Sequence, residues 1–329
     1  MRLCVFGAGA IGGFIAAHLA RVDGIEVSVV ARGAHLAAIQ GNGITVKSPG
    51  GSFTSRVRAT DKPAELGKQD VVFIALKQHQ VTAVLDDLSL MLGPDSMVVP
   101  PTTGIPYWYF HGLEGPFENR QIERLDPGGR QWRVLGAERA VGCVYWVATE
   151  VVQPGVVHHD GKFANFPIGE PDGSISARVT ALGRAMEAGG LEAPIVENIR
   201  SWLWMKMISS LSWNPVAVLT LATNGEIAKR PEVVDIVRRM MVEGGSLAAK
   251  FGVHDMPMSV EERLGLGLSI TGHKMSMLQD LERGRPLEMN VLLDSVRAMR
   301  DLSDVDVPTI DLVCNLLELR AANVAPAPA

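Results

Sequence analysis

A glycine-rich turn near the start of the chain restricts the fold of its first half more than any other segment. The motif GAGAIG (7–12) follows directly on the short apolar run LCVF (3–6) and opens an alanine-rich stretch. These segments predict a strand, a tight turn and a helix, which is the context in which the G-x-G-x-x-G spacing is informative. Gly7 permits the turn, Gly9 lets the backbone approach a pyrophosphate, and Gly12 lets the helix pack on the strand.

The start of this predicted helix is expected to bind phosphate groups. The first N–H groups of a helix lack intrahelical partners, and the helix dipole adds positive potential there. We therefore predict a cofactor-binding loop formed by Gly7, Ala8, Gly9, Ala10, Ile11 and Gly12. The alternative is a structural glycine turn that holds no ligand.

Three further apolar runs predict buried strands in the first half: EVSVVAR (26–32), DVVFIALK (70–77) and SMVVPPTTG (96–104). The stretches between them, at 34–43 and around 79–92, are expected to be helical. Buried strands that alternate with helices indicate a parallel sheet covered on both faces. The polar, glycine-rich segment 107–136 predicts a long loop, and residues 140–169 predict hairpins that end this domain.

The pattern changes near Gly169, and from there to about Ala322 it is helical throughout. We predict helices over 174–190, 197–223, 231–251, 258–282, 287–302 and 308–321. A strand–helix half followed by an all-helical half is a two-domain enzyme layout. We place the first domain at 1–170, the second at 171–323, and a tail that is disordered by composition at 324–329.

Composition and charge argue against several classes of function. The net charge is −5 and no cluster of Lys and Arg interleaved with aromatics occurs, so a nucleic-acid partner is not expected. The 3 cysteines lie far apart, which predicts neither a disulfide framework nor a metal site. Residues 201–222 have the length of a membrane span, but Lys206 and Pro215 lie inside it. Without a targeting signal, the chain is expected to be cytoplasmic and to bind no membrane.

Arg32 indicates which dinucleotide the turn would hold. NAD-selective sites usually carry Asp or Glu at the end of the second strand, where the carboxylate binds the ribose hydroxyls. Here that strand ends VVARGAH, which puts Arg32 in the same place. A guanidinium matches a 2′-phosphate in charge and geometry, so the sequence favours NADP(H) over NAD. An ordinary surface arginine is the alternative.

Lys77 ends the run DVVFIALK and Thr103 follows SMVVPP, so both lie at C-terminal strand ends, where open parallel sheets bind their ligands. The nicotinamide end of a dinucleotide passes there. This position favours a functional interpretation of Lys77 over a solvated lysine at the start of a loop.

Lys206 is the single charge between Ser201 and Ala222 and lies among Trp, Met and Ile side chains. In a helix, Lys206, Ser210 and Asn214 are four residues apart and form a polar stripe, which is either a hydrogen-bonded seam or the wall of a cleft. Desolvation would lower the pKa of such a lysine and suit it to general acid catalysis. The alternative is a lysine whose stem packs among apolar groups while its amine reaches water.

A polar partner for Lys206 is expected in the segment HKMSMLQDLERGRPLEMN (273–290). Ser276, Asp280 and Glu288 are the residues there that we expect to face a cleft. Sequence spacing alone does not choose among them.

These residues resemble the ketopantoate reductases (2-dehydropantoate 2-reductases) along nearly the whole chain. The matching pieces are GAGAIG, Arg32, LK at 76–77, TGIP at 103–106, W-x-K at 204–206, NP at 214–215 and SMLQDLERGRPLEMN at 276–290. The last block is specific to this family among Rossmann dehydrogenases. The resemblance implies an α/β fold: a Rossmann-type doubly wound parallel sheet domain, then an all-helical C-terminal domain, with the active site between them.

The resemblance also implies roles for individual residues. Lys206 corresponds to the general acid that protonates the ketone oxygen while NADPH delivers hydride to the carbon, and Glu288 to the acidic residue that supports the site. Ser276 and Asn214 match substrate-binding positions, and Lys77 matches a lysine near the nicotinamide ribose. Ser210 stands at a further substrate-binding position and Thr103 at a cofactor-binding position. The implied reaction reduces a small 2-oxo acid to a 2-hydroxy acid, with ketopantoate to pantoate, in pantothenate and coenzyme A biosynthesis, as the first choice.

Two positions depart from the family pattern. In the loop after SMVVPP the family usually carries Asn-Gly, where this chain has Thr103-Gly104, and Ser210 stands where the helix often carries Asn. The alternatives are a paralogous reductase of another branched 2-oxo acid, an opine-type dehydrogenase with a different proton donor, and a non-catalytic dinucleotide-binding sensor. The Met- and Leu-rich helical half predicts either a homodimer interface or a large core.

Overall fold

The computed structural model describes residues 1–272, 274–285, 287 and 289–323, without the side chains of 162 and 163. The chain folds as two compact units. Met1–Thr102 and Pro106–Ile199 form the first, and Thr103–Ile105 joins the chain from Arg200 onward in the second. Among the described residues, no helix combines the length and the apolar character that crossing a membrane requires.

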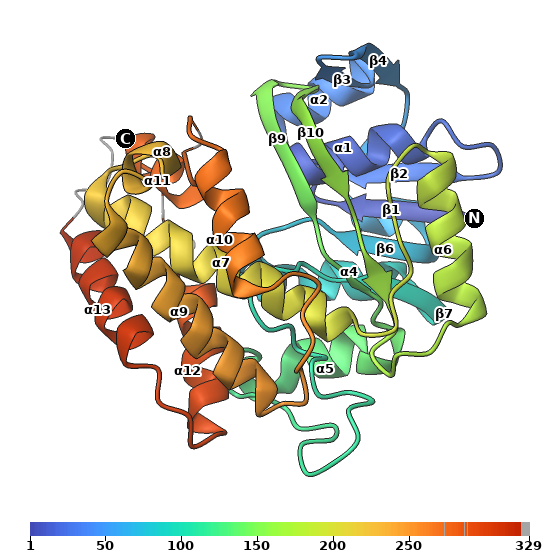
Figure 1. Ribbon diagram of the computed structural model, residues 1–329. Helices are drawn as coiled ribbons and strands as arrows, with labels where there is room; N and C mark the ends of the chain where they lie inside the picture. The colour runs from blue at the N-terminus through green and yellow to red at the C-terminus, as the bar shows by residue number, and fades with distance from the viewer. Residues whose placement is uncertain (273, 286, 288, 324–329) are drawn as a thin grey trace. The chain divides into compact units, whose positions relative to one another are not determined.

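The first unit is built on a five-stranded parallel sheet with the strand order β5-β2-β1-β6-β7. Figure 1 labels four of these strands, β2, β1, β6 and β7. Its strands are β1 (Arg2–Phe6), β2 (Glu26–Val30), β5 (Arg58–Thr60), β6 (Gln69–Ile74) and β7 (Leu92–Val99). Successive residues of β1 and β6 are buried, so both faces of the sheet are covered, as predicted. The chain order reverses at β1, and the carboxyl ends of β1, β2 and β6 therefore form the point at which open parallel sheets bind ligands.

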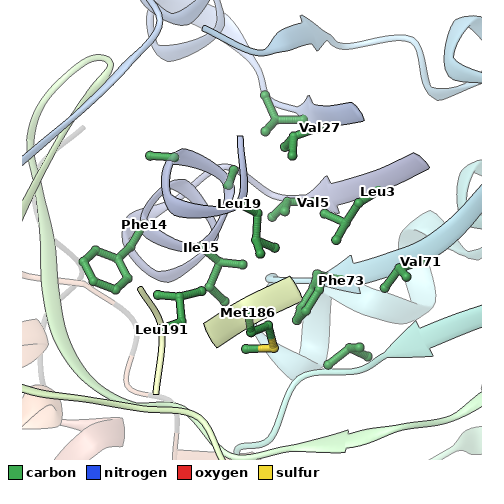
Figure 2. Packing of buried hydrophobic residues seen from close by; sticks show 14 of the residues in the cluster. Leu3, Val5, Phe14, Ile15, Leu19, Val27, Val71, Phe73, Met186 and Leu191 are labelled. Atoms are coloured by element: carbon green, nitrogen blue, oxygen red, sulfur yellow. The ribbon is translucent and has the colours of Figure 1, made fainter. Parts of the chain in front are cut away.

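The core of this unit joins the parallel sheet to α1 and α6 and includes residues of α2 and β3 (Ile44–Ser48). The unit's helices are α1 (Ala10–Leu19), α2 (Gly33–Asn42), α3 (Gln78–Val81), α4 (Leu85–Met91), α5 (Arg130–Leu135) and α6 (Ala177–Ala188), with short 3₁₀ turns η1 (Pro63–Leu66), η2 (Thr82–Val84), η3 (Pro127–Gly129) and η4 (Ala137–Arg139). Figure 2 shows Ile15 of α1 and Phe73 of β6 in one cluster with Met186 of α6 and Leu191. Because α6 contributes to this core, the division of the chain falls near Ile199, later than the boundary expected at 170.

A second, four-stranded sheet packs across α1. Its strands are β3 (Ile44–Ser48), β4 (Gly51–Ser55), β9 (Trp146–Gln153) and β10 (Val156–Asn165), in the order β4-β3-β10-β9. The β9–β10 hairpin confirms the hairpin predicted at 140–169, and a short pair of β8 (Gly142–Cys143) with β11 (Ile168–Gly169) completes that region. The parallel pairing of β10 with β3 was not predicted.

The segment expected to be a long polar loop is packed and partly helical. It opens with the aromatic run Tyr107–Phe110, in which no side chain is more than 5% exposed. Asp126 is buried, and its carboxylate accepts hydrogen bonds from the backbone N–H groups of Gln131 (2.8 Å) and Trp132 (2.9 Å). This cap fixes the start of α5, because it pairs donors that the helix itself leaves free.

The second unit is helical, as predicted. Its helices are α7 (Ile199–Thr220), α8 (Asn224–Ile227), α9 (Pro231–Ala249), α10 (Val260–Ser269), α11 (Ser276–Glu282), α12 (Met289–Asp301) and α13 (Pro308–Ala322). The single helix expected over 258–282 is wrong, because the chain leaves helical geometry between α10 and α11. There the Thr271 carbonyl accepts the Gly225 N–H (2.9 Å), a bond to α8 in place of an intrahelical one.

Candidate functional site

A pocket of about 600 Å³ lies in the first unit at the carboxyl ends of β1 and β2. Its walls come from the glycine turn, from the end of β2 with the start of α2, and from the segment after β6. The lining residues are Phe6, Gly7, Ala8, Gly9, Val30, Ala31, Arg32, His35, Leu76, His79, Gln80, Ala83 and Val84. The pocket therefore occupies the position at which the topology of the sheet predicts a ligand.

The three motif glycines meet different steric demands. Gly7 has φ +102°, and a Cβ there would lie 2.9 Å from the Ala75 carbonyl oxygen. A Cβ on Gly12 would lie 2.1 Å from the Gly7 carbonyl oxygen, so only glycine fits where α1 meets the turn. A Cβ on Gly9 would meet no atom within 4 Å. Gly7 and Gly12 thus allow close packing, whereas the space over Gly9 is open to the pocket.

The start of α1 keeps donors available for an anion. The Gly7 and Ala8 N–H groups donate to the Val30 carbonyl (3.0 and 3.2 Å), which ties the turn to β2. The N-cap residue Gly9 offers no side-chain cap, and the first turn of α1 contains no acidic residue. The next N–H groups have no partner within the helix, and the helix dipole makes this end positive. A pyrophosphate is the kind of group such an end binds.

Arg32 stands at the rim of the same pocket. It is the N-cap residue of α2, and its side chain is exposed. Within the described part of the chain it forms no ion pair and no side-chain hydrogen bond, and the pocket lining includes no Asp or Glu. The guanidinium is therefore available to an anionic group of a ligand.

His35 also lines the pocket, and sequence reasoning missed it. Its Nδ1 accepts the Gly155 N–H (3.1 Å), so Nε2 carries the proton and donates to the Ala8 carbonyl (2.7 Å). The imidazole thus joins the glycine turn to the β9–β10 hairpin. The one available signal was its place three residues after Arg32, on the first turn of α2.

The other predicted cofactor residues lie outside the pocket lining. Ala10 and Ile11 belong to the first turn of α1, and Gly12 is buried beneath the turn. Lys77 is half-buried at the start of α3, next to the lining residue Leu76. Thr103 is grouped with the second unit, where the N–H of Ile105, two residues further on, donates to Ser295 Oγ on α12 (2.8 Å).

In the second unit, α7 carries the predicted polar stripe. Lys206 and Ser210 are half-buried, and Asn214 is 4% exposed. Asn214 Nδ2 donates to the Ser210 carbonyl (2.9 Å), while Oδ1 accepts from the Met277 N–H (3.1 Å) and Ser276 Oγ (3.5 Å). The stripe is thus linked to the start of α11, and Asn214 and Ser276 are brought together. Glu288 lies outside the described residues.

No group of three or more His, Cys, Asp or Glu side chains in the described ranges is arranged to hold a metal ion. The part of the chain whose geometry fits a cofactor is the pocket around the glycine turn.

Comparison with known proteins agrees with this geometry. The model of the family described as ketopantoate reductase PanE/ApbA matches residues 3–173, and that of its C-terminal domain matches residues 198–321. A 2-dehydropantoate 2-reductase of Mesorhizobium japonicum is 43% identical over 96% of this chain and 97% of its own.

Solved structures give the same assignment. A ketopantoate reductase from Ralstonia solanacearum, described as putative, superposes with a TM-score of 0.88 at 34% identity, covering 98% of each chain. D-Mandelate dehydrogenase with NADH and anilino(oxo)acetate superposes with a TM-score of 0.80 over 98% of this chain and 99% of its own, but its 17% identity shows the fold alone. The predicted resemblance and Rossmann-type fold are confirmed: the chain belongs to the ketopantoate reductase family of oxidoreductases.

Proposed function

We propose that this chain catalyses the NADPH-dependent reduction of a 2-oxo acid, with ketopantoate as the first substrate to test. The observation that carries the proposal is the pocket at the glycine turn, where open space lies over Gly9 and Arg32 pairs with no carboxylate of the described residues. The name of the Mesorhizobium relative, 2-dehydropantoate 2-reductase, supports the choice of substrate.

The proposed binding mode follows from the pocket walls. The turn 7–12 binds the pyrophosphate through backbone N–H groups, and Arg32 binds the 2′-phosphate of the adenosine ribose. His35 holds the Ala8 carbonyl in place and thereby keeps the turn in shape. Lys77, which follows β6, lies toward the nicotinamide end in this mode. When bound, the cofactor supplies the hydride to the carbonyl carbon of the substrate.

Lys206 is the proposed proton donor to the ketone oxygen. Its neighbours Trp204, Met205 and Met207 are all buried, and Lys206 itself is half-buried at the start of the polar stripe. A cation at this place stabilises the negative charge that develops on the oxygen as hydride arrives.

Ser210 and Ser276 are the proposed substrate-binding residues, Asn214 a residue of the same site that acts through Ser276, and Thr103 a residue of the cofactor side. Because both polar atoms of the Asn214 amide are engaged by the chain, we assign it the positioning of Ser276. Glu288 keeps the supporting role that the family resemblance implies.

The test is steady-state oxidation of NADPH with ketopantoate and a panel of branched 2-oxo acids. Lys206→Ala should lower kcat by about 10²- to 10⁴-fold, the usual contribution of a general acid. The dissociation constant of NADPH should stay unchanged, because the pocket is formed by residues of the first unit. Lys229→Ala, which removes an exposed lysine of the second unit, is the matched control.

Each alternative gives a different result. Binding of NADPH without turnover of any 2-oxo acid would favour a dinucleotide sensor. Turnover that survives Lys206→Ala would point to another proton donor, as in an opine-type dehydrogenase. A higher kcat/KM for a different branched 2-oxo acid than for ketopantoate would identify a paralogous reductase.

We also propose that the chain is located in the cytoplasm and forms a homodimer. Cys4, Cys143 and Cys314 are free and buried, which supports a reducing compartment. Light scattering on the purified chain measures the molar mass, and a monomer at micromolar concentration would contradict the dimer.

A further inference from the structure

The helical unit contains a second pocket, of about 530 Å³, away from the polar stripe of α7. It lies between the C-terminal half of α9 and the start of α10, and the segment that connects these helices closes one side. Its lining combines apolar side chains with polar ones: Val242, Ala249, Val253, Met256, Met258 and Val260 on the one hand, and Ser246, His254, Asp255, Ser259 and Arg263 on the other, with Gly245 between them.

Arg263 is the one buried charge in this wall. The residue is 5% exposed, and its Nε donates to the Ser259 carbonyl (3.4 Å). Nη1 is buried without a hydrogen-bond partner, and no carboxylate in the described residues pairs with the guanidinium. Burial lowers the pKa of Arg263, although a guanidinium remains charged at neutral pH. A buried cation without a counter-ion is costly, and proteins rarely leave one unpaired.

The nearby acidic residues are engaged elsewhere or face solvent. Glu261 pairs with Arg238 on α9 (2.8 Å), and the Glu262 carboxylate accepts the Ser259 N–H in a capping box at the start of α10 (2.8 Å). Asp255 lines the pocket but is exposed and forms no ion pair among the described residues. Among the described residues, the charge of Arg263 at the wall of this pocket is therefore uncompensated.

We propose that this pocket is a binding site for a small monocarboxylate with an apolar body. The carboxylate pairs with the Arg263 guanidinium, and the hydrocarbon part packs against Met256 and Met258. Arg263 is the one buried cation among the lining residues, and its single charge matches a single negative charge. A dianion such as phosphate fits less well, because Asp255 at the rim would repel it. The site is separate from the pocket around the glycine turn and does not depend on the proposed reaction.

Methionine methyl NMR on the full chain tests the proposal, because Met256 and Met258 are reporters inside the pocket. Isovalerate is the probe and isovaleramide, its uncharged analogue, is the ligand control. We expect saturable shifts of both methyl signals with isovalerate and at least tenfold weaker binding of the amide, the order of effect of one charge-assisted hydrogen bond. Binding of the acid at any other site leaves these two signals unchanged.

Arg263→Leu should abolish the isovalerate shifts, whereas Arg238→Leu, which removes an exposed arginine beside the same helices, should leave them intact. Without ligand, Arg263→Leu should raise Tm, since it removes an uncompensated buried charge. The proposal is overturned if isovalerate leaves both methyl signals unmoved, if the amide binds equally well, or if Arg263→Leu still binds. It is also overturned if Arg263→Leu lowers Tm or prevents folding, because the arginine would then be paired within the chain.

Discussion

Replacing His35 by Phe keeps a flat ring at the pocket wall but removes both of its hydrogen bonds. In the native chain the imidazole links the Ala8 carbonyl of the glycine turn (2.7 Å) to the Gly155 N–H of the β9–β10 hairpin (3.1 Å). Ala8 is 3% exposed, so water has little access to the Ala8 carbonyl as a replacement for the histidine. The variant therefore leaves a carbonyl and an N–H group to find new partners.

The size of the effect follows from these two bonds. A neutral hydrogen bond contributes about 0.5–1.5 kcal/mol net, so losing both should lower the free energy of unfolding by about 1–3 kcal/mol. The glycine turn is the part of the pocket that would hold the pyrophosphate, and a turn held on one side only is less preorganised. If about half of the lost energy comes from the turn, the Kd of NADPH should rise by roughly threefold to tenfold.

Urea unfolding and a fluorescence titration with NADPH measure the two quantities. His79→Phe is the matched control, because His79 lines the same pocket and forms no hydrogen bond in the described part of the chain. We expect the control to change the free energy of unfolding by less than about 0.5 kcal/mol. A His35→Phe chain with native stability and native Kd would refute the reasoning. Lower stability with an unchanged Kd of NADPH would show that His35 stabilises the hairpin and not the glycine turn.

Three further predictions test other parts of the account. Arg32→Gln should raise the Kd of NADPH by about tenfold at low salt and leave that of NADH unchanged, with Arg58→Gln on β5 as the control; equal losses for both cofactors would refute the assignment of the 2′-phosphate. Burial lowers the pKa of His18 from 6.5, so the unfolded chain takes up the proton first, and the free energy of unfolding should fall as the pH drops below about 6.5. His18→Gln should flatten this pH dependence in urea titrations at several pH values, and an unchanged slope would contradict the prediction. Asn214→Leu should lower the free energy of unfolding by about 1–3 kcal/mol, because it leaves the Met277 N–H at the start of α11 unpaired, whereas Asn214→Asp, which keeps the acceptor, should lower it less. Equal losses in the two variants would show that the hydrogen bond from Met277 is not the cause.

Much of the first unit could be predicted because its signals are local. The apolar runs, the glycine turn and the helical periodicity each depend on neighbouring residues, and the strands near 3–6, 26–32 and 70–77 are present in the structure. The pairing of β3 with β10 joins residues more than a hundred positions apart. Nothing in either strand alone specifies that partner, so the second sheet was missed.

The candidate site was predictable to the extent that it rests on a motif. Gly7, Ala8, Gly9 and Arg32 line the pocket as expected, because a motif with defined spacing fixes where the turn lies. His35 was missed because its role depends on Gly155, a contact between distant parts of the chain.

The expected helix 258–282 failed for the same kind of reason. Helical periodicity continues along the sequence, but bonds to α7 and α8 compete with the intrahelical ones. The Thr271 carbonyl accepts from Gly225, and Asn214 accepts the Met277 N–H.

The transfer of hydride from NADPH to a 2-oxo acid is the central claim, and isotope transfer measures it directly. The chain is incubated with ketopantoate and NADPH that carries deuterium at the transferring position of the nicotinamide ring, and the product is analysed by mass spectrometry. The account predicts a 2-hydroxy acid with deuterium on its hydroxyl-bearing carbon, formed by the native chain and greatly reduced with Lys206→Ala. NADPH binding without any deuterated product, from ketopantoate or from the other branched 2-oxo acids, would contradict it.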